Sequence, residues 1–86
     1  MDSKGYVYIL RSEVTGKLYV GSTRDLVKRL KAHNYGKVRS TKSGKPYTMI
    51  HSEEFPDYTS ARKRENYLKS GPGRRWIQDN VLPRIP

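Results

Sequence analysis

Apolar residues near the start of the chain form two short runs with the alternation typical of β-strands. Residues 5–11 and residues 18–21 are both rich in β-branched and aromatic side chains, and a polar turn separates them. Gly16 is the position in this turn best suited to a positive φ. Two strands joined so closely are antiparallel, so Tyr8 and Tyr19 are expected to lie opposite or diagonal to each other.

A helical period follows the second strand. The helix is expected to begin at a cap provided by Thr23 or Asp25 and to end near Asn34. The 3.6-residue period places Arg29 and His33 on the same side as the helix's leucines, facing the sheet. A helix that only packs would carry apolar residues there, so this arginine and histidine are candidates for chemistry.

The middle and the end of the chain predict further elements. Residues 35–46 are rich in Gly, Ser and Lys and are expected to form a mobile basic loop. Residues 47–55 predict a third strand, and Pro56 ends it. The stretch 70–73 is expected to end the second helix, and residues 74–77 to form a short third one. Trp76, Ile77 and Leu82 are expected to close the core.

The second helix carries a single acidic residue. It is expected to start at Asp57 or Thr59 and to run to Lys69, and Glu65 falls on the same face as Ala61. An ionised carboxylate on an inward face needs a cation, a metal ion or hydrogen-bond donors, because burying it alone is costly. Glu65 therefore has either a structural ion partner or a functional role.

Composition narrows the class of protein. Eighteen Lys and Arg residues against eight Asp and Glu give a net charge of +10 over 86 residues. This excess favours a polyanionic partner, and nucleic acid fits better than a membrane, because the cations are not opposite a wide apolar helix face. A merely basic, soluble surface is the alternative. The cations expected to contact the nucleic acid are Lys28, Lys37, Arg39, Lys42 and Lys45.

Length and cysteine content suggest where the protein works. The chain has no cysteine, no long apolar run and no apolar segment near its start, so we expect a cytoplasmic protein that forms one domain over residues 1–86. There is also no Walker-type phosphate loop and no pair of carboxylates suited to two metal ions. We find no internal repeat.

Five polar residues are directed towards one side of this small α+β unit, and together they suggest phosphodiester hydrolysis. A single carboxylate can hold one hard divalent ion, whose other ligands are water and phosphate oxygens. An arginine suits the negative charge of a pentacovalent phosphoryl transition state. A tyrosine or histidine can accept a proton from water, although a phenol needs nearby cations to do so near neutral pH. The five residues are Tyr8, Tyr19, Arg29, His33 and Glu65.

These residues and their spacing resemble the GIY-YIG nucleases. The match consists of Tyr6-Val7-Tyr8, Tyr19-Val20-Gly21, Arg29 and the Arg64-Glu65-Asn66 context, and it extends from Gly5 to about Ile77. The resemblance implies a three-stranded antiparallel sheet flanked by helices, as in the small stand-alone members. Two departures are visible. Tyr6 replaces the first motif glycine, and a late asparagine of some members has only Asn80 as its counterpart.

The resemblance also implies a role for each matching residue. Tyr8 corresponds to the tyrosine proposed as general base, and Tyr19 to the one that orients the nucleophile or phosphate. Arg29 corresponds to the arginine that stabilises the phosphate, and His33 to a histidine-or-tyrosine position one turn later. Glu65 corresponds to the ligand of Mg²⁺ or Mn²⁺. Taken singly, each has an ordinary alternative: a cross-strand tyrosine pair, a solvated arginine, a helix-end histidine and a structural ion pair.

Three possibilities follow from this interpretation. The first is a metal-dependent DNA endonuclease that is selective for DNA structure or only weakly specific, and is linked to DNA repair or recombination. The second is a basic nucleic-acid-binding module that keeps the fold without cleavage. The third is a protein that acts only within a larger assembly, in which a partner supplies substrate recognition. The natural substrate and the choice between DNA and RNA are open at this point.

Overall fold

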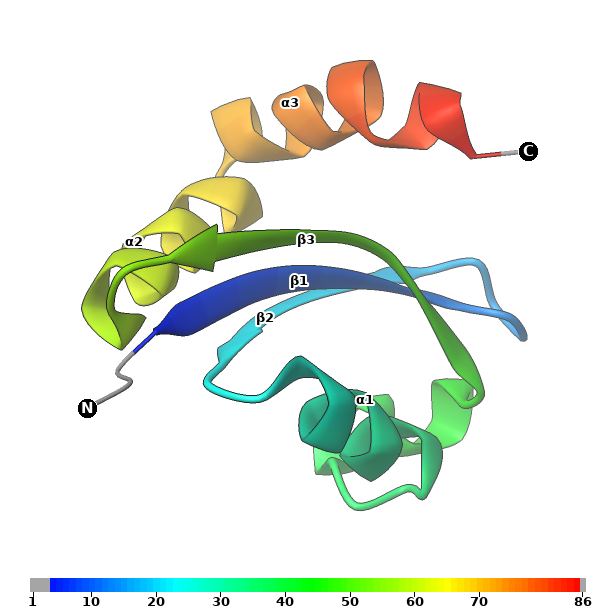
Figure 1. The fold of residues 1–86 in the computed structure, drawn as a ribbon. Helices are drawn as coiled ribbons and strands as arrows, with labels where there is room; N and C mark the ends of the chain where they lie inside the picture. Colours follow the sequence, from blue (N-terminus) through cyan, green and yellow to red (C-terminus); the bar gives the residue numbers. More distant parts are fainter. Residues whose placement is uncertain (1–3, 86) are drawn as a thin grey trace.

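A three-stranded antiparallel sheet lies at the centre of the molecule, and helices cover both of its faces (Figure 1). The computed structural model describes residues 4–85. Strand β1 (Gly5–Ser12) is central, with β2 (Leu18–Thr23) on one side and β3 (Tyr47–Phe55) on the other. Both pairings are antiparallel, so the predicted α+β class with a three-stranded antiparallel sheet is confirmed.

The β1–β2 hairpin has the geometry expected from the sequence. Gly16 has φ +75° in the turn, a conformation that other residues rarely adopt. The register pairs Tyr8 with Gly21 and Leu10 with Tyr19, so the two tyrosines are diagonal neighbours. Their ring centroids are 6.2 Å apart. The local hairpin therefore places two phenols side by side on one face of the sheet.

The face that carries these tyrosines is covered by α1 (Leu26–Asn34) and by a 3₁₀ helix, η1 (Arg39–Gly44). Asp25 caps α1 by accepting a hydrogen bond from the backbone N–H of Lys28 at 3.0 Å. The prediction of a loop over residues 35–46 was wrong for half of that stretch, which η1 occupies. Thr41 is buried inside η1 and its hydroxyl bonds to His33 and to Val38, so this polar segment has internal hydrogen-bond partners.

The opposite face is covered by α2 (Tyr58–Lys69) and α3 (Gly71–Asn80), followed by the short 3₁₀ helix η2 (Leu82–Arg84) (Figure 1). The expected third helix was too short. A single residue, Ser70, both ends α2 and caps α3 by accepting from the N–H of Gly73. Pro72 fits the first turn of α3, where its missing N–H costs nothing, so it starts a helix here and does not break one.

The apolar core lies between the sheet and the α2–α3 layer. Val7 and Ile9 of β1 point into it, and Leu68, Ile77 and Val81 approach from the helices. All five are at most 3% exposed. Trp76 and Leu82 pack against this cluster, so the prediction that Trp76, Ile77 and Leu82 close the core is confirmed.

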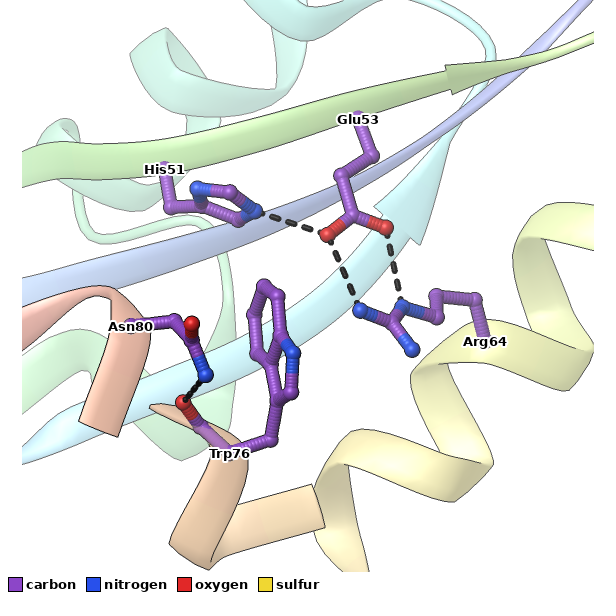
Figure 2. Close-up of polar contacts among 5 residues, drawn as sticks. All are labelled: His51, Glu53, Arg64, Trp76 and Asn80. Atoms are coloured by element: carbon purple, nitrogen blue, oxygen red, sulfur yellow. Dashed lines mark hydrogen bonds and ion pairs between the residues drawn. The ribbon is translucent and has the colours of Figure 1, made fainter. Parts of the chain in front are cut away.

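A polar and aromatic cluster joins β3 to both helices of this layer (Figure 2). The Glu53 carboxylate accepts hydrogen bonds from Arg64 Nε at 2.9 Å and Nη2 at 3.3 Å. His51 Nε2 lies 2.8 Å from the same carboxylate. The Arg64 guanidinium is 4.6 Å from the centre of the Trp76 ring, which links α2 to α3. The side-chain amide of Asn80 donates a hydrogen bond to the Trp76 carbonyl at 3.0 Å, at the C-terminal end of α3.

Removal of the Arg64 side chain should lower the free energy of unfolding at pH 7 and make that free energy fall less steeply as the pH becomes acidic. Burial raises the pKa of Glu53, but hydrogen bonds from Arg64 and His51 outweigh burial and hold this pKa below its usual 4.5. The carboxylate therefore contributes stability above about pH 4.5, and this contribution is lost as pH falls through the folded-state pKa. We expect Arg64→Met to cost about 1–2 kcal/mol at pH 7 and less at pH 3.5, measured by urea unfolding.

Arg75→Met is the matched control, because Arg75 lies on α3 in an exposed pair with Asp79 at 4.0 Å. Equal stabilities for the two variants at pH 7 would contradict the structural role given to Arg64.

Candidate active site

The hydroxyl of Tyr8 is buried between two basic side chains of α1. Tyr8 is 1% exposed and projects from the central strand towards α1. Its Oη atom accepts a hydrogen bond from Arg29 Nε at 3.1 Å and lies 3.0 Å from His33 Nε2. Arg29 and His33 are one helical turn apart, so both reach the same hydroxyl. The sequence-based expectation that these three residues meet is confirmed by the distances.

The hydrogen-bond pattern fixes the tautomer of His33. Thr41 donates its hydroxyl proton to the carbonyl of Val38 at 3.3 Å, so Thr41 Oγ1 accepts a hydrogen bond from His33 Nδ1 at 2.7 Å. The neutral ring then carries no proton on Nε2, and this nitrogen accepts from the Tyr8 hydroxyl. Arg29 Nε donates to the same hydroxyl oxygen. One directed chain of hydrogen bonds therefore runs from Arg29 of α1 to Tyr8 of β1, returns to His33 of α1 and continues to Thr41 of η1.

Burial keeps both central members of this chain neutral near pH 7. Burial, reinforced by the charge of Arg29, lowers the pKa of His33 to about 4. Burial also raises the pKa of Tyr8 to about 12, although the hydrogen bond and charge of Arg29 act in the opposite direction. Arg29 supplies the nearby cation that a tyrosine base requires, but in the free protein desolvation has the larger effect.

Tyr19 and Gly21 complete this side of the site. The Tyr19 ring lies 4.8 Å from the His33 ring, measured between centroids, and is only partly buried. A β-carbon added at Gly21 would lie 2.5 Å from Tyr8 Oη and 3.0 Å from the Tyr19 ring. Glycine is therefore required at position 21 because the Tyr8 side chain passes directly over its backbone.

Glu65 approaches the same strand from the other side of the sheet. Its Oε1 accepts a hydrogen bond from Ser22 Oγ at 2.5 Å, and its Oε2 lies 2.6 Å from Lys69 Nζ. Ser22 pairs with Val7, whose side chain points into the α2–α3 core, whereas the tyrosines face α1. The expectation that all five polar residues point to one side was therefore wrong. Four lie on the α1 side, and Glu65 lies in the α2 layer.

The two groups nevertheless meet at neighbouring residues of β2, because the Tyr8 hydroxyl lies over Gly21 and Glu65 is bound to Ser22. The charge of Glu65 is one of the minor causes that raise the pKa of Tyr8. Burial tends to raise the pKa of Glu65 itself, but Lys69 and Ser22 stabilise its ionised form and the net effect lowers the pKa. The Glu65 side chain is 12% exposed. The ionised and partly accessible Glu65 carboxylate thus lies next to Ser22 of edge strand β2.

A metal ion at Glu65 would have few protein ligands. Within residues 4–85 there is no group of three or more His, Cys, Asp or Glu side chains that could hold a metal. The Glu65 carboxylate and the Ser22 hydroxyl provide hard oxygen atoms, which fit a single Mg²⁺ or Mn²⁺ that keeps water and phosphate oxygens as its other ligands. Lys69 would have to leave the carboxylate oxygen that it now contacts.

The cations selected from the sequence lie on exposed surface of the α1–η1 layer. Lys28 lines a shallow hollow of about 260 Å³ together with Arg29, Thr23, Asp25 and Ala32. The remaining four, Lys37, Arg39, Lys42 and Lys45, are exposed within or beside η1. Arg29 thus connects the buried hydroxyl of Tyr8 to an open surface with excess positive charge.

Three residues of the site had no role in the sequence-based interpretation. Thr41 lay in a stretch interpreted as a loop, and nothing in its local sequence indicates a contact with His33. Lys69 follows Glu65 by four residues, a helical spacing that does indicate an ion pair. Ser22 could have been placed from the alternation of β2, which puts it on the face opposite Tyr19 and Gly21.

This combination of fold and residues defines a known class of domain. A family model described as the GIY-YIG catalytic domain matches residues 4–75, which is most of the chain. The protein therefore belongs to the GIY-YIG catalytic domain family.

Small proteins with the name UPF0213 are among its relatives. The UPF0213 protein of Syntrophus aciditrophicus is 43% identical over 70 residues, and the match covers 78% of each chain. That of Streptococcus sanguinis is 37% identical over 70 residues, covering 80% of this chain and 79% of the relative. The solution NMR structure of a UPF0213 protein from Bacillus halodurans superposes with a TM-score of 0.53 at 29% identity, covering 88% of this chain and 83% of the other.

The expected partner, nucleic acid and not a membrane, can be compared with the helices of the structure and with the family. No helix within residues 4–85 has both the length and the apolarity needed to span a bilayer. Membership of a nuclease family implies a nucleic-acid substrate, in agreement with the net charge of +10.

His33 should remain neutral through the physiological range as the Nδ1–H tautomer. With a folded-state pKa of about 4, its imidazole signals should not shift between pH 5.5 and 8. Nitrogen-15 NMR of the ring tests both statements, and a His51→Gln variant assigns the signals because the chain has two histidines. A titration midpoint near pH 6.5, or a proton on Nε2, would contradict the hydrogen-bond chain.

Proposed function

We propose that this protein is a divalent-metal-dependent DNA endonuclease that hydrolyses phosphodiester bonds. The observation that carries the proposal is the meeting of Arg29, Tyr8 and His33 around one hydroxyl, which lies over Gly21, while the next residue of β2, Ser22, binds the Glu65 carboxylate. Membership of the GIY-YIG catalytic domain family supports this reaction class. The scissile phosphate would lie at the edge of β2, between the tyrosines on one side and Glu65 on the other.

Glu65 is the residue that would hold the metal ion, with Mg²⁺ or Mn²⁺ as the expected ion. When bound, such an ion would neutralise phosphate charge and polarise the phosphorus–oxygen bonds. The protein's own contribution is to keep the carboxylate ionised and aimed by the Ser22 hydroxyl. Arg29 would stabilise the extra negative charge that develops on the phosphate as the water oxygen bonds to phosphorus and the bond to the leaving sugar oxygen breaks. The leaving oxygen would take up a proton from solvent water.

The hydrogen-bond chain supplies a path for the proton of the attacking water. Tyr8 Oη would accept this proton as its own proton passes to His33 Nε2, so the phenol never carries a full charge. The imidazolium formed in this way is disfavoured by burial and by Arg29. The negative charge that grows on the phosphate has to offset that cost, which would make the transfer depend on a bound substrate.

Selectivity for the shape of DNA suits the surface around this site. The cations near α1 and η1 can contact phosphates, and phosphate contacts carry no sequence information. We therefore propose branched or distorted DNA, as formed in repair and recombination, as the substrate.

A basic nucleic-acid-binding module without cleavage is the second candidate, and one observation favours it. Both oxygens of Glu65 are already paired, one with Ser22 and the other with Lys69. A site in which this pairing persisted would bind nucleic acid through its cations but would hold no metal ion.

Glu65→Gln should separate the two candidates. We expect the wild type to nick supercoiled plasmid and branched DNA in Mg²⁺ or Mn²⁺ but not in EDTA. The variant should lose nicking and keep its affinity for DNA, because the amide cannot replace the anionic metal ligand. Gel analysis of both proteins, purified in parallel, gives the measurement and controls for contaminating nuclease. DNA binding without nicking by either protein would support the binding module.

Arg29→Ala tests the role proposed for the arginine. Transition-state stabilisation should fall by about 3–4 kcal/mol, as for removal of a key oxyanion donor, while DNA affinity changes much less. Single-turnover cleavage and equilibrium binding provide the two values. Lys28→Ala is the control, since it removes the same charge from an exposed neighbour in the same helix. Parallel losses of rate and affinity in Arg29→Ala would mean that Arg29 only binds.

A further inference from the structure

A groove with an apolar floor lies between edge strand β2 and the helices of the α2–α3 layer. Its volume is about 490 Å³. Five aliphatic side chains contribute to it from β2, α2, α3 and η2, and four other residues complete the lining. The lining residues are Leu18, Tyr19, Val20, Leu68, Lys69, Arg74, Ile77, Gln78 and Leu82.

The lining combines apolar surface with positive charge and contains no acidic residue. Lys69 and Arg74 are its charged members, and Gln78 adds one amide. Leu18 remains 37% exposed, although its position faces the same layer as the core. An exposed apolar surface beside cations suits a ligand with a flat, weakly polar body and an anionic arm. A nucleotide has both parts.

The groove also begins next to the proposed metal ligand. Along β2, Ser22 holds Glu65, and Val20 and Leu18 follow on the same face at steps of roughly 7 Å. Lys69 belongs to both places, because its ammonium contacts Glu65 and its side chain lines the groove. A nucleic-acid strand that placed one phosphate at Glu65 would thus bring an adjacent nucleotide over the apolar floor.

We propose that this groove binds an unpaired nucleotide that adjoins the scissile phosphate. The base would lie on the aliphatic floor, and Lys69 and Arg74 would contact the flanking phosphates. A paired base is stacked inside a duplex and cannot reach such a floor, whereas a base in a single strand, flap or bulge can. The inference rests on the proposed function for its ligand, and it identifies the substrate as DNA with unpaired nucleotides at the cut.

Charge argues against a second copy of this chain in the groove. Each copy has a net charge of +10, and the cations at the rim would face a like-charged molecule. An anionic strand, in contrast, gains from the same cations. Nucleic acid is therefore the occupant that the chemistry of the lining favours.

The test measures binding in EDTA, where no cleavage occurs. The probes are a single-stranded oligonucleotide carrying 2-aminopurine and the fully paired duplex of the same sequence. Leu18→Ser should weaken binding of the single strand roughly fivefold or more, as expected for loss of a base contact, and leave duplex binding unchanged. Val14→Ser is the matched control, because Val14 is 66% exposed in the hairpin turn, outside the groove.

A second pair of variants tests the charged rim of the groove without changing its apolar floor. Arg74→Gln and Arg75→Gln remove the same charge from neighbouring positions of α3, but only Arg74 lines the groove. Single-strand affinity should fall more in Arg74→Gln, and duplex affinity should fall equally in both. Circular dichroism establishes that all four variants are folded.

The outcomes separate this inference from the proposed function. Identical single-strand affinities for Leu18→Ser and Val14→Ser, and for the two arginine variants, would overturn the groove assignment even if Glu65→Gln abolishes nicking. Sedimentation that shows a wild-type dimer lost in Leu18→Ser would overturn it in favour of a contact between copies. Groove-dependent binding by a protein that never nicks DNA would support the nucleotide site and refute the nuclease.

Discussion

The buried hydroxyl of Tyr8 is the constraint on which the site depends. Tyr8 is 1% exposed, so its hydroxyl must find its hydrogen-bond partners within the protein, because leaving them unmade costs on the order of 1–3 kcal/mol. Its partners come from α1, and the imidazole partner needs its own acceptor in η1. The Tyr8 hydroxyl thus ties the central strand to both α1 and η1, and further hydrogen bonds from Ser12 to Gly44 and between Asn34 and Tyr47 hold the same layer on the sheet.

Edge strand β2 is where the two faces of the sheet meet. Its alternation sends Tyr19 towards His33 and Ser22 towards Glu65, so one short strand contacts both layers. Gly21 stands between these positions, and its lack of a side chain lets the Tyr8 ring extend to the edge. A phosphate at this edge would be approached from both faces at once. In our proposal, catalysis therefore needs the edge strand to remain uncovered.

Much of the framework was predictable because its signals are local. The third strand has the bounds 47–55 that its composition predicts, and Asp25 and Asp57 were both among the expected caps. The failures have a common cause. The helical turns of η1 depend on the buried hydrogen bond of Thr41 to His33, which is distant in the local pattern. The helix α3 begins early because Ser70 is both the last cap of α2 and the first cap of α3. The face on which Glu65 lies depends on which helix covers which side, and local periodicity does not determine that.

In the proposed reaction the Tyr8 hydroxyl, and not merely its ring, takes part in the chemistry. The most direct measurement is the single-turnover cleavage rate of Tyr8→Phe on branched DNA in Mn²⁺, with Tyr6→Phe as the control on the same face of the same strand. Loss of the hydroxyl should slow cleavage by about 100-fold or more at unchanged DNA affinity, whereas the control should cleave normally. Cleavage by a folded Tyr8→Phe protein at the wild-type rate would show that the Tyr8 hydroxyl has no role in the reaction.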